Sequence, residues 1–494
     1  MNILRWIIAC PASAALWIAS WAQLPLSVDT TFRVDLPAQN AFSVWSLEDG
    51  RLVISGNLEF PDLPNPRSGA RLLPNGERDL TFNQGFLPMG GKITPWQNGY
   101  YSGNGPGVRR FLFDGQLDPD FILQNDDPYF SSLQGGDYHV YPDGRVLMTG
   151  LHTIDAAHLG WQGAYNLIWF TSTGYLDTTR TPRSGNGINW AIKEYPEGTA
   201  GDLGGRFLVH TWGTTYEGQP VDKVFRIHAD GSLDDSFNSN IEWGYIQALE
   251  ILPDGRAYIG GTFRMSGDND TLQVIRVMPD GNLDPTFNNA IDMVSLNPTS
   301  LDAKVLCIYP IAPGLIVLGG RFNEVEQQPR KGICMIDTLG NLVSYFDGAA
   351  TGDYTHFGLV YGSVAGFTQA PDGSYYLWGA YHGYSDGTTN DTLQRMVTRL
   401  FGGEIGLGVR PTAQPLPGMR LYPNPTSTQL TLELDAFSPG TELLLRDGLG
   451  KAVLRQRIGG HYHTVQVGTL PSGCYIAELL ANGRRVAQQK LLVQ

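Results

Sequence analysis

The sequence repeats a tight glycine turn that is followed by a short apolar run ending in glycine. The clearest copies begin at Pro142-Asp143-Gly144, Pro253-Asp254-Gly255 and Pro371-Asp372-Gly373. The turn glycines of the seven copies, spaced 45 to 59 residues apart, are Gly50, Gly99, Gly144, Gly198, Gly255, Gly314 and Gly373. Proline presets the φ angle of such a turn, and glycine takes the positive φ that closes a hairpin. A period near 50 residues with several strands in each unit predicts a propeller or a solenoid.

A second motif, Asp-Gly-x-Leu-Asp-x-x-Phe, alternates with the first. It is cleanest at 114–121, 230–237 and 280–287, and degenerate at 75–82, 173–180 and 340–346. The repeated aspartates of the clean copies are Asp118, Asp234 and Asp284. Because a catalytic residue need occur only once, their recurrence predicts a structural role in capping turns.

The two ends of the repeat region look like complementary halves of one unit. Residues 28–32 carry half of the second motif without its turn, and the strand predicted at 396–400 has no motif after it. A ring closed in this way has no exposed sheet edge. We therefore predict an all-β chain with a seven-bladed β-propeller over residues 23–408.

The strand ends Gly260-Gly261-Thr262-Phe263 and Gly319-Gly320-Arg321-Phe322, together with both motifs, resemble the delta-60 repeat of bacterial β-propellers. The resemblance spans about residues 28–402. It implies the propeller fold and does not imply one activity.

The N-terminus has the features of a secretory signal peptide. A basic start at Arg5 precedes apolar residues 6–18, and Ser20-Trp21-Ala22 supplies the small residues of a cleavage site. We predict a signal peptide at 1–22, cleaved between Ala22 and Gln23. The apolar run is too short to span a bilayer, so no membrane span is expected in the mature chain. The cysteines that remain, Cys307, Cys334 and Cys474, are odd in number and are expected to be buried thiols rather than a disulfide framework.

A second module follows a proline-containing linker at 409–418. Leu430, Leu432 and Leu434 alternate with polar residues, as in a strand with one buried face. Six or seven such short strands predict a small Ig-like β-sandwich at 419–494.

This module resembles the type A sorting domain of type IX secretion. The resemblance rests on Leu421-Tyr422-Pro423-Asn424-Pro425, on 447–451, on 470–475 and on 490–493. Cys474 departs from the pattern, which prefers valine or another small residue. The resemblance implies that residues 419–494 engage the type IX secretion machinery and that the protein is displayed on the cell surface or released.

The charge balance narrows the choice of partners. The chain has 34 Lys and Arg against 48 Asp and Glu, a net charge of −14, and residues 23–415 alone carry −18. Such a chain has no electrostatic reason to bind nucleic acid. The negative sign also predicts that anionic ligands are disfavoured.

The long variable connections lie on the face of the ring opposite the tight turns, because successive connections of antiparallel strands alternate between faces. Function on a rigid scaffold concentrates in such loops. Aromatic residues there could stack on sugars or anchor a protein, although packing between blades is an equally good reading for each one. These candidate binding residues are Trp161, Trp243, Tyr245, Tyr354 and Tyr384.

The sequence contains no assembled catalytic, metal or cofactor motif. His152, Asp155 and His158 share one loop, and Asp268-Asn269-Asp270 another, but neither has a recognised ligand spacing. The leading hypothesis is therefore a surface or released propeller that binds an extracellular polysaccharide or protein. Two alternatives stay open: a carbohydrate-active hydrolase or lyase with carboxylates at the centre of the ring, and a purely architectural surface component.

Overall fold

The computed structural model describes residues 24–405 and 419–494, except 35, 37–38, 86–87, 105–106, 125–127, 297–301, 357, 435–439, 448–450 and 482–483. The chain divides into two compact units, residues 1–408 and 409–494. The predicted signal peptide with its cleavage site at Ala22 and Gln23, and the predicted linker at 409–418, lie outside the described residues.

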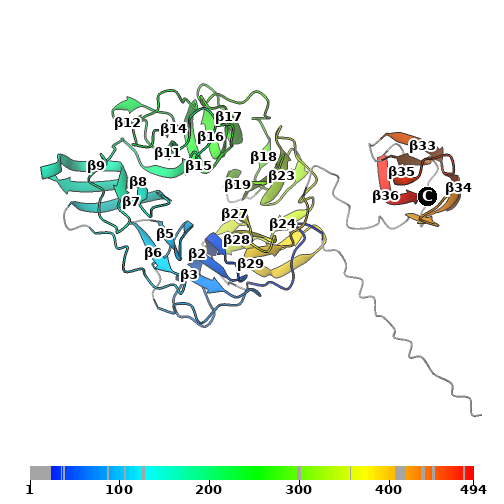
Figure 1. Cartoon of the computed structure of the whole chain (residues 1–494), viewed down its shortest axis with the longest axis horizontal. Helices are drawn as coiled ribbons and strands as arrows, with labels where there is room; N and C mark the ends of the chain where they lie inside the picture. Colours follow the sequence, from blue (N-terminus) through cyan, green and yellow to red (C-terminus); the bar gives the residue numbers. More distant parts are fainter. Residues whose placement is uncertain are drawn as a thin grey trace, which may run out of the picture. The chain divides into compact units, whose positions relative to one another are not determined.

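The first unit consists of antiparallel sheets that follow one another around a ring (Figure 1). In its described part, seven of these sheets carry one of the predicted turn glycines at the connection between their first two strands, and we call them repeat sheets 1 to 7. Sheets 1 to 3 are β1 (Gln39–Ser46), β2 (Leu52–Leu58) and β3 (Arg67–Leu72); β4 (Ile93–Trp96), β5 (Gly99–Asn104) and β6 (Gly107–Leu112); and β7 (Tyr129–Val140), β8 (Val146–Ala156) and β9 (Trp161–Phe170). Sheets 4 and 5 are β10 (Asn189–Glu194), β11 (Phe207–Thr211) and β14 (Val224–Ile227); and β15 (Ile241–Ile251), β16 (Ala257–Met265) and β17 (Leu272–Val277). Sheets 6 and 7 are β19 (Lys304–Ala312), β20 (Leu315–Arg321) and β23 (Ile333–Asp337); and β27 (Ser363–Gln369), β28 (Tyr375–Asp386) and β29 (Asn390–Leu400), with β24 (Ala349–Thr351) added to β28.

The predicted turn glycines connect the first two strands of each sheet. Six of the seven have φ between +82° and +86°, which is the conformation that requires glycine. Gly99 is the exception, and the positive φ of that turn falls on Gln97 at +45°. The only helical segment in the described residues is one 3₁₀ turn, Ala157–Leu159. The prediction of an all-β propeller is confirmed.

The second motif adds a single bridge to the outer edge of each sheet instead of a full fourth strand. Its leucine pairs with the end of the third strand, as in Phe111↔Leu117 and Val277↔Leu283. In sheet 7 the partner comes from the other end of the chain, because Val28 forms an antiparallel bridge with Leu400. The two ends of the repeat region therefore meet in one sheet, as the half motifs predict.

Buried ion pairs hold the second motif in place. The guanidinium of Arg276 contacts Asp284 at 2.7 Å, and the side chains of both residues are 2% exposed. The other oxygen of Asp284 accepts hydrogen bonds from the backbone and hydroxyl of Thr286. The same pairing joins Arg71 to Asp79, Arg110 to Asp118, Arg226 to Asp234 and Arg399 to Asp29. These aspartates cap turns, as their recurrence predicts.

Four of these arginines also reach the neighbouring sheet. Arg276 of sheet 5 donates to the carbonyl oxygen of Thr338 in sheet 6 at 2.5 Å, and Arg226 of sheet 4 donates to that of Pro279 at 2.5 Å. Arg71 and Arg110 donate in the same way to Phe113 and Ser172. The pair therefore links one sheet to the next as well as closing a turn.

The two sheets that break the motif compensate for the change. In sheet 6, Val343 stands at the aspartate position and Met335 at the arginine position, so both charges are lost together. In sheet 3, Trp169 replaces the arginine and Arg180 replaces the motif phenylalanine. Arg180 lies over the Trp169 ring at 5.9 Å and donates to the carbonyl oxygen of Ala229 in sheet 4. The cation and the aromatic ring have exchanged places while the link between sheets is kept.

Acid is expected to weaken the propeller through these aspartates. Burial alone would raise the pKa of Asp79, but hydrogen bonds from Thr81 and the ion pair with Arg71 outweigh it and lower the pKa to about 2, from an ordinary 3.8. A carboxyl whose pKa is depressed by folding contributes stability above its unfolded pKa and loses it as the pH falls through the folded value. Urea unfolding should therefore show stability falling between about pH 4 and pH 2. Asp79→Asn should make that fall shallower, whereas stability that is constant down to pH 2 would contradict the prediction.

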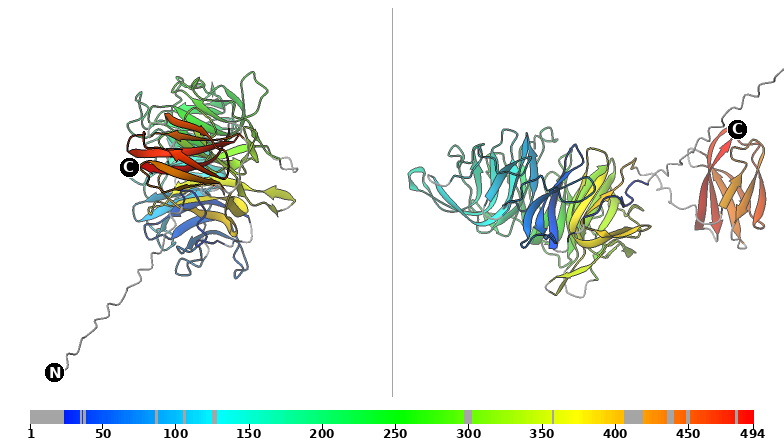
Figure 2. Two further views of the ribbon diagram at one scale, coloured as in Figure 1. Left: turned by 90° about the vertical axis from the view of Figure 1, so that its right-hand side faces the viewer. Right: turned by 90° about the horizontal axis from the view of Figure 1, so that it is seen from below.

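The second unit contains two antiparallel sheets around one core (Figure 2). One sheet has the order β30 (Met419–Tyr422), β31 (Gln429–Leu434) and β34 (Tyr462–Gln466). The other has the order β33 (Ala452–Arg457), β32 (Thr441–Arg446), β35 (Gly473–Ala481) and β36 (Arg484–Val493). Leu430, Leu432 and Leu434 are buried together, as their alternation predicts.

The three cysteines are free thiols. Burial raises the pKa of Cys307 and of Cys334 to about 12, so neither thiol ionises near neutral pH. Cys474 is exposed, and the expectation that it is buried is wrong.

Candidate functional site

A pocket of about 420 Å³ lies where the first strands of five repeat sheets converge. It is lined by Asp137 of β7, Ala191 of β10, Gln247 of β15, Leu306 of β19 and Ala365 of β27, with Trp190, His210, Trp212, Tyr245 and Ile246. Several of these first strands face the middle of the ring (Figure 1). The pocket is therefore central to the ring.

The pocket opens on the face of the long connections. Trp190 stands near the start of β10, Tyr245 in the first half of β15, and Trp212 directly after the end of β11. First strands start, and second strands end, on the side opposite the tight turns. This is the face on which the sequence predicts binding.

Four aromatic side chains form a continuous group at this pocket, which we call the central aromatic cluster: Trp190, Trp212, Trp243 and Tyr245. The ring centroids of Trp190 and Trp212 are 4.7 Å apart, those of Trp212 and Tyr245 5.6 Å, and those of Trp243 and Tyr245 6.2 Å. Trp212, Trp243 and Tyr245 are 45%, 43% and 44% exposed. Trp243 and Tyr245 share one side of β15 because side chains alternate along a strand, and Gly244 and Ile246 between and beside them are buried.

The carboxylate of Asp137 and the imidazole of His210 already have partners within the chain. The carboxylate of Asp137 pairs with Lys92 at 2.8 Å and accepts the backbone N–H of Ile192 at 3.3 Å. Burial lowers the pKa of His210 to about 4, so its imidazole is neutral at pH 7. Asp137 is the one carboxylate among the described residues that line the pocket, whereas most glycosidases place two beside the scissile bond.

The structure places the five predicted binding residues in different surroundings. Trp243 and Tyr245 meet in the central aromatic cluster, whereas Trp161 is half-buried against the core of sheet 3. Tyr354, in β25 (Tyr354–His356), stacks on His382 with ring centroids 4.2 Å apart. Tyr384 is fully buried in the core and offers no ring to the surface.

Sequence reasoning missed Trp190 and Trp212. Both lie at strand ends on the predicted face: Trp190 is the second residue of β10, and Trp212 is the first residue of the connection between β11 and β14. The signal that could have found them is the order of strands in a propeller, because the starts of first strands surround the axis.

The residues considered as metal ligands have other contacts, and His152 and Asp155 lie in β8 instead of a loop. His152 is buried, lies 2.8 Å from the hydroxyl of Ser132 and has its pKa lowered to about 4 by burial. Asp268 caps its own loop by accepting a hydrogen bond from the backbone N–H of Asp270. Within the part of the chain that the structure describes, no group of three or more His, Cys, Asp or Glu side chains could hold a metal ion.

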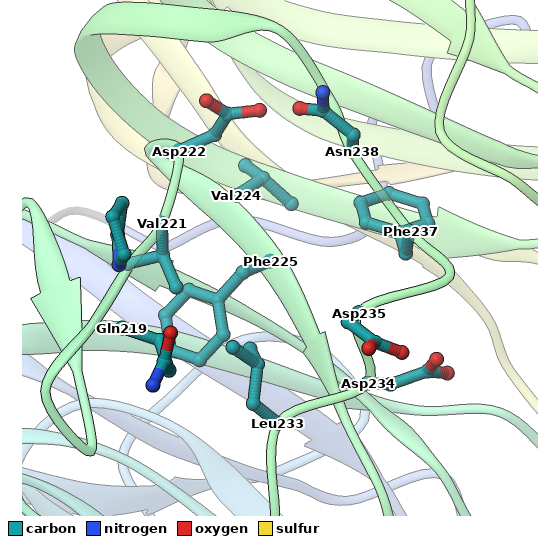
Figure 3. Close-up of a pocket in the computed structure, with 11 residues that line it drawn as sticks. Gln219, Val221, Asp222, Val224, Phe225, Leu233, Asp234, Asp235, Phe237 and Asn238 are labelled. Carbon is teal, nitrogen blue, oxygen red and sulfur yellow. The ribbon is translucent and has the colours of Figure 1, made fainter.

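Larger pockets lie at the outer rim of the ring, and one of about 610 Å³ borders β14 (Figure 3). Asp222 and Asn238 lie at one end of it, and Asp234 and Asp235 lie together at the other. Comparable pockets lie beside the motif leucines Leu117 of sheet 2 and Leu342 of sheet 6. Their recurrence where the fourth strand is reduced to one bridge assigns them to the repeat architecture.

Two family descriptions match separate parts of the chain. Residues 420–494 match a secretion system C-terminal sorting domain. Residues 205–237 and 252–287 match a domain of unknown function (DUF5122) described as a beta-propeller. A search of curated proteins found no match.

Solved structures are similar at low sequence identity. The extracellular domain of a putative one-component system of B. thetaiotaomicron is 11% identical with a TM-score of 0.42, and the match covers 96% of this chain and 59% of that domain. PorZ, a surface component of the type IX secretion system of Porphyromonas gingivalis, is 11% identical with a TM-score of 0.20, covering 93% and 82%. The Pan2 WD40 domain of Neurospora crassa is 12% identical with a TM-score of 0.35, covering 77% and 99%. The chain thus spans 59% of the length of the B. thetaiotaomicron domain.

The sorting-domain match and the sequence motifs of 419–494 agree on how the protein leaves the cell. No helix formed by the described residues is long and apolar enough to cross a membrane. The family match at 205–237 and 252–287 and the ring of repeat sheets both indicate that the first unit is a β-propeller. The chain is a β-propeller protein with a C-terminal sorting domain of the type IX secretion system, and it is exported to the cell surface or secreted.

Proposed function

We propose that the exported propeller binds an extracellular polysaccharide in its central pocket. The observation that carries this proposal is the central aromatic cluster, in which Trp212 and Tyr245 are nearly half exposed beside a concave site. Ligand pockets are lined mainly by hydrophobic and aromatic side chains, and aromatic rings bury large areas when a partner covers them.

The shape of the site favours a sugar over a protein surface. The rings of Trp212 and Tyr245 stand at 85° to each other, so they form two walls instead of one flat platform. The C–H face of a pyranose can pack on one wall while its hydroxyls reach the exposed amide of Gln247 and the carboxylate of Asp137. A standard protein interface instead needs about 800 Å² of matching surface on each partner.

Replacing Trp212 with alanine should lower the affinity for the bound polysaccharide roughly 30-fold, or about 2 kcal/mol, because it removes the ring that joins Trp190 to Tyr245. The ligand is first found by screening the full exported chain against an array of extracellular polysaccharides. Affinities of the chain and its variants are then measured by titration calorimetry.

Two aromatic residues away from the pocket provide matched controls. Tyr175, 54% exposed in the turn after β9, lies on the opposite face, and Trp161 lies on the same face outside the cluster. Tyr175→Ala and Trp161→Ala should each leave the affinity unchanged. Binding that depends on Trp161 and not on Trp212 would place the binding site outside the central pocket. Binding of proteins and of no polysaccharide would refute a polysaccharide as the ligand.

A further inference from the structure

Three basic side chains border the central aromatic cluster, and we call them the basic edge: Arg264, Lys304 and Arg321. The Lys304 ammonium lies 5.3 Å from the centroid of the Tyr245 ring. The Arg264 guanidinium lies 5.1 Å from the centroid of the Trp243 ring. Arg321 is the cross-strand partner of Lys304 in the pairing of β19 with β20. Cations and aromatic rings therefore alternate across repeat sheets 5 and 6.

The pair formed by Lys304 and Arg321 is electrostatically unfavourable. Like charges directly opposite each other in a sheet repel. Burial lowers the pKa of Lys304 and the charge of Arg321 lowers it further, whereas the carboxylate of Asp302 raises it in part. Arg321 donates through Nε to the backbone oxygen of Asp302, which neutralises no charge.

No carboxylate in the described part of the chain forms an ion pair with any of the three basic groups. By contrast, Arg226 and Arg276 of the repeat motif are matched to buried aspartates. A chain with 14 more acidic than basic residues has many carboxylates that could have balanced these cations. Among the described residues, the carboxylate of Asp302 acts on Lys304 and Arg321 as a nearby charge without forming an ion pair with either. The positive charge at the cluster is therefore available to an external anion.

We propose that the basic edge binds the carboxylate or sulfate groups of an acidic polysaccharide whose sugar rings lie against the central aromatic cluster. This inference rests on the proposed function and names its substrate class. It also reverses the expectation drawn from net charge. At physiological salt the field of distant charges is screened beyond about 8 Å, so the local cations decide which ligand is attracted.

The test compares acidic and neutral forms of the same polymer. The probes are polygalacturonate with its fully methyl-esterified form, and dextran sulfate with dextran, titrated into the full exported chain. The first pair reports carboxylate recognition and the second reports sulfate recognition. We expect one acidic polymer to bind at least about tenfold tighter than its neutral form, because hydrogen bonds between charged partners are about twice as strong as neutral ones.

The double variant Lys304→Gln with Arg321→Gln should lose that tenfold advantage and keep the affinity for the neutral polymer. Arg145→Gln is the matched control, because Arg145 lies in a tight turn of sheet 3 on the opposite face and pairs with Asp143. Raising the salt concentration should also reduce the advantage in the unaltered chain, a readout that does not depend on the variant folding.

The possible failures are distinguishable. Equal binding of acidic and neutral polymers overturns this inference and leaves the proposed function standing. A chain that binds none of the four polymers and no polysaccharide on the array refutes both. Polyglutamate is included as a fifth probe, and its binding in place of the polysaccharides would show that the basic edge serves an acidic protein.

Discussion

Replacing Asp284 with valine is expected to lower the free energy of unfolding of the propeller by about 3–5 kcal/mol, because it leaves a buried charge without its partner. Arg276 is 2% exposed and has Asp284 as its ion-pair partner. The substitution also removes the cap on Thr286 and the second ion pair with Arg256. Tryptophan fluorescence in urea measures the loss for the propeller alone, because residues 419–494 contain no tryptophan.

Repeat sheet 6 shows how the same position is built without charge. Three residues of sheet 5 form the charged site: Tyr258, Arg276 and Asp284. The equivalent residues of sheet 6 are Val317, Met335 and Val343, and the first two of these are fully buried. Replacing a buried ion pair by apolar groups of similar size is often neutral. The triple variant Tyr258→Val, Arg276→Met and Asp284→Val should therefore recover at least half of the stability that Asp284→Val loses.

The exposed turn of the same motif supplies the control. Asp280 caps Asn282 at the surface, and Asp280→Ala should change stability by no more than about 1 kcal/mol. A triple variant as unstable as Asp284→Val alone would show that the loss comes from the shape of the site and the missing cap. The charge left behind would then not be its cause.

The hairpins and the closure of the ring could be predicted because their causes are local. Gly144 and Gly255 are required by a positive φ within a four-residue turn, and the Pro-Asp-Gly sequence predicts that turn directly. The half motif at Val28 lacks the strand that precedes it in the other copies, which predicts pairing with a distant strand. In the structure Val28 pairs with Leu400 of β29. The capping role of Asp284 follows from its repetition.

The exchanged pair of Trp169 and Arg180 was beyond the same reasoning. In the sequence, residues 173–180 look like a degenerate copy of the second motif, because Arg180 takes the place of its phenylalanine and Trp169 that of the arginine before it. The compensation exists only in space, where the ring and the guanidinium meet at 5.9 Å.

The central aromatic cluster depends on distant parts of the chain coming together. Trp190 and Tyr245 are 55 residues apart, and they meet at one pocket because two first strands face the same axis. Burial is equally hidden in the sequence. Tyr245 lies in the first half of β15 and Tyr384 near the end of β28, yet the first is 44% exposed and the second is fully buried in the core of sheet 7. Net charge is uninformative about the cations near Lys304 for the same reason, since it averages over the whole chain.

Deleting residues 419–494 is expected to abolish export and leave a folded propeller inside the cell. The sorting domain is a separate compact unit with its own core, so its removal exposes no core of the ring. The measurement is the fraction of protein in the medium and on the cell surface, by immunoblot, in a bacterium that has type IX secretion. The retained protein should keep the tryptophan fluorescence and the urea midpoint of the propeller in the full chain.

Single substitutions separate the recognition of this unit from its mere presence. Cys474 is exposed at a position where the sorting-domain pattern prefers valine, so Cys474→Val should leave export unchanged. Leu432 is fully buried in the core between the two sheets, and Leu432→Asp should stop export almost as completely as the deletion, because a buried carboxylate with no partner unfolds so small a unit. Export of the truncated chain at the level of the full chain would show that the signal lies in the propeller. Export of Leu432→Asp at that level would show that a short linear segment is read, and that the folded sandwich is not required.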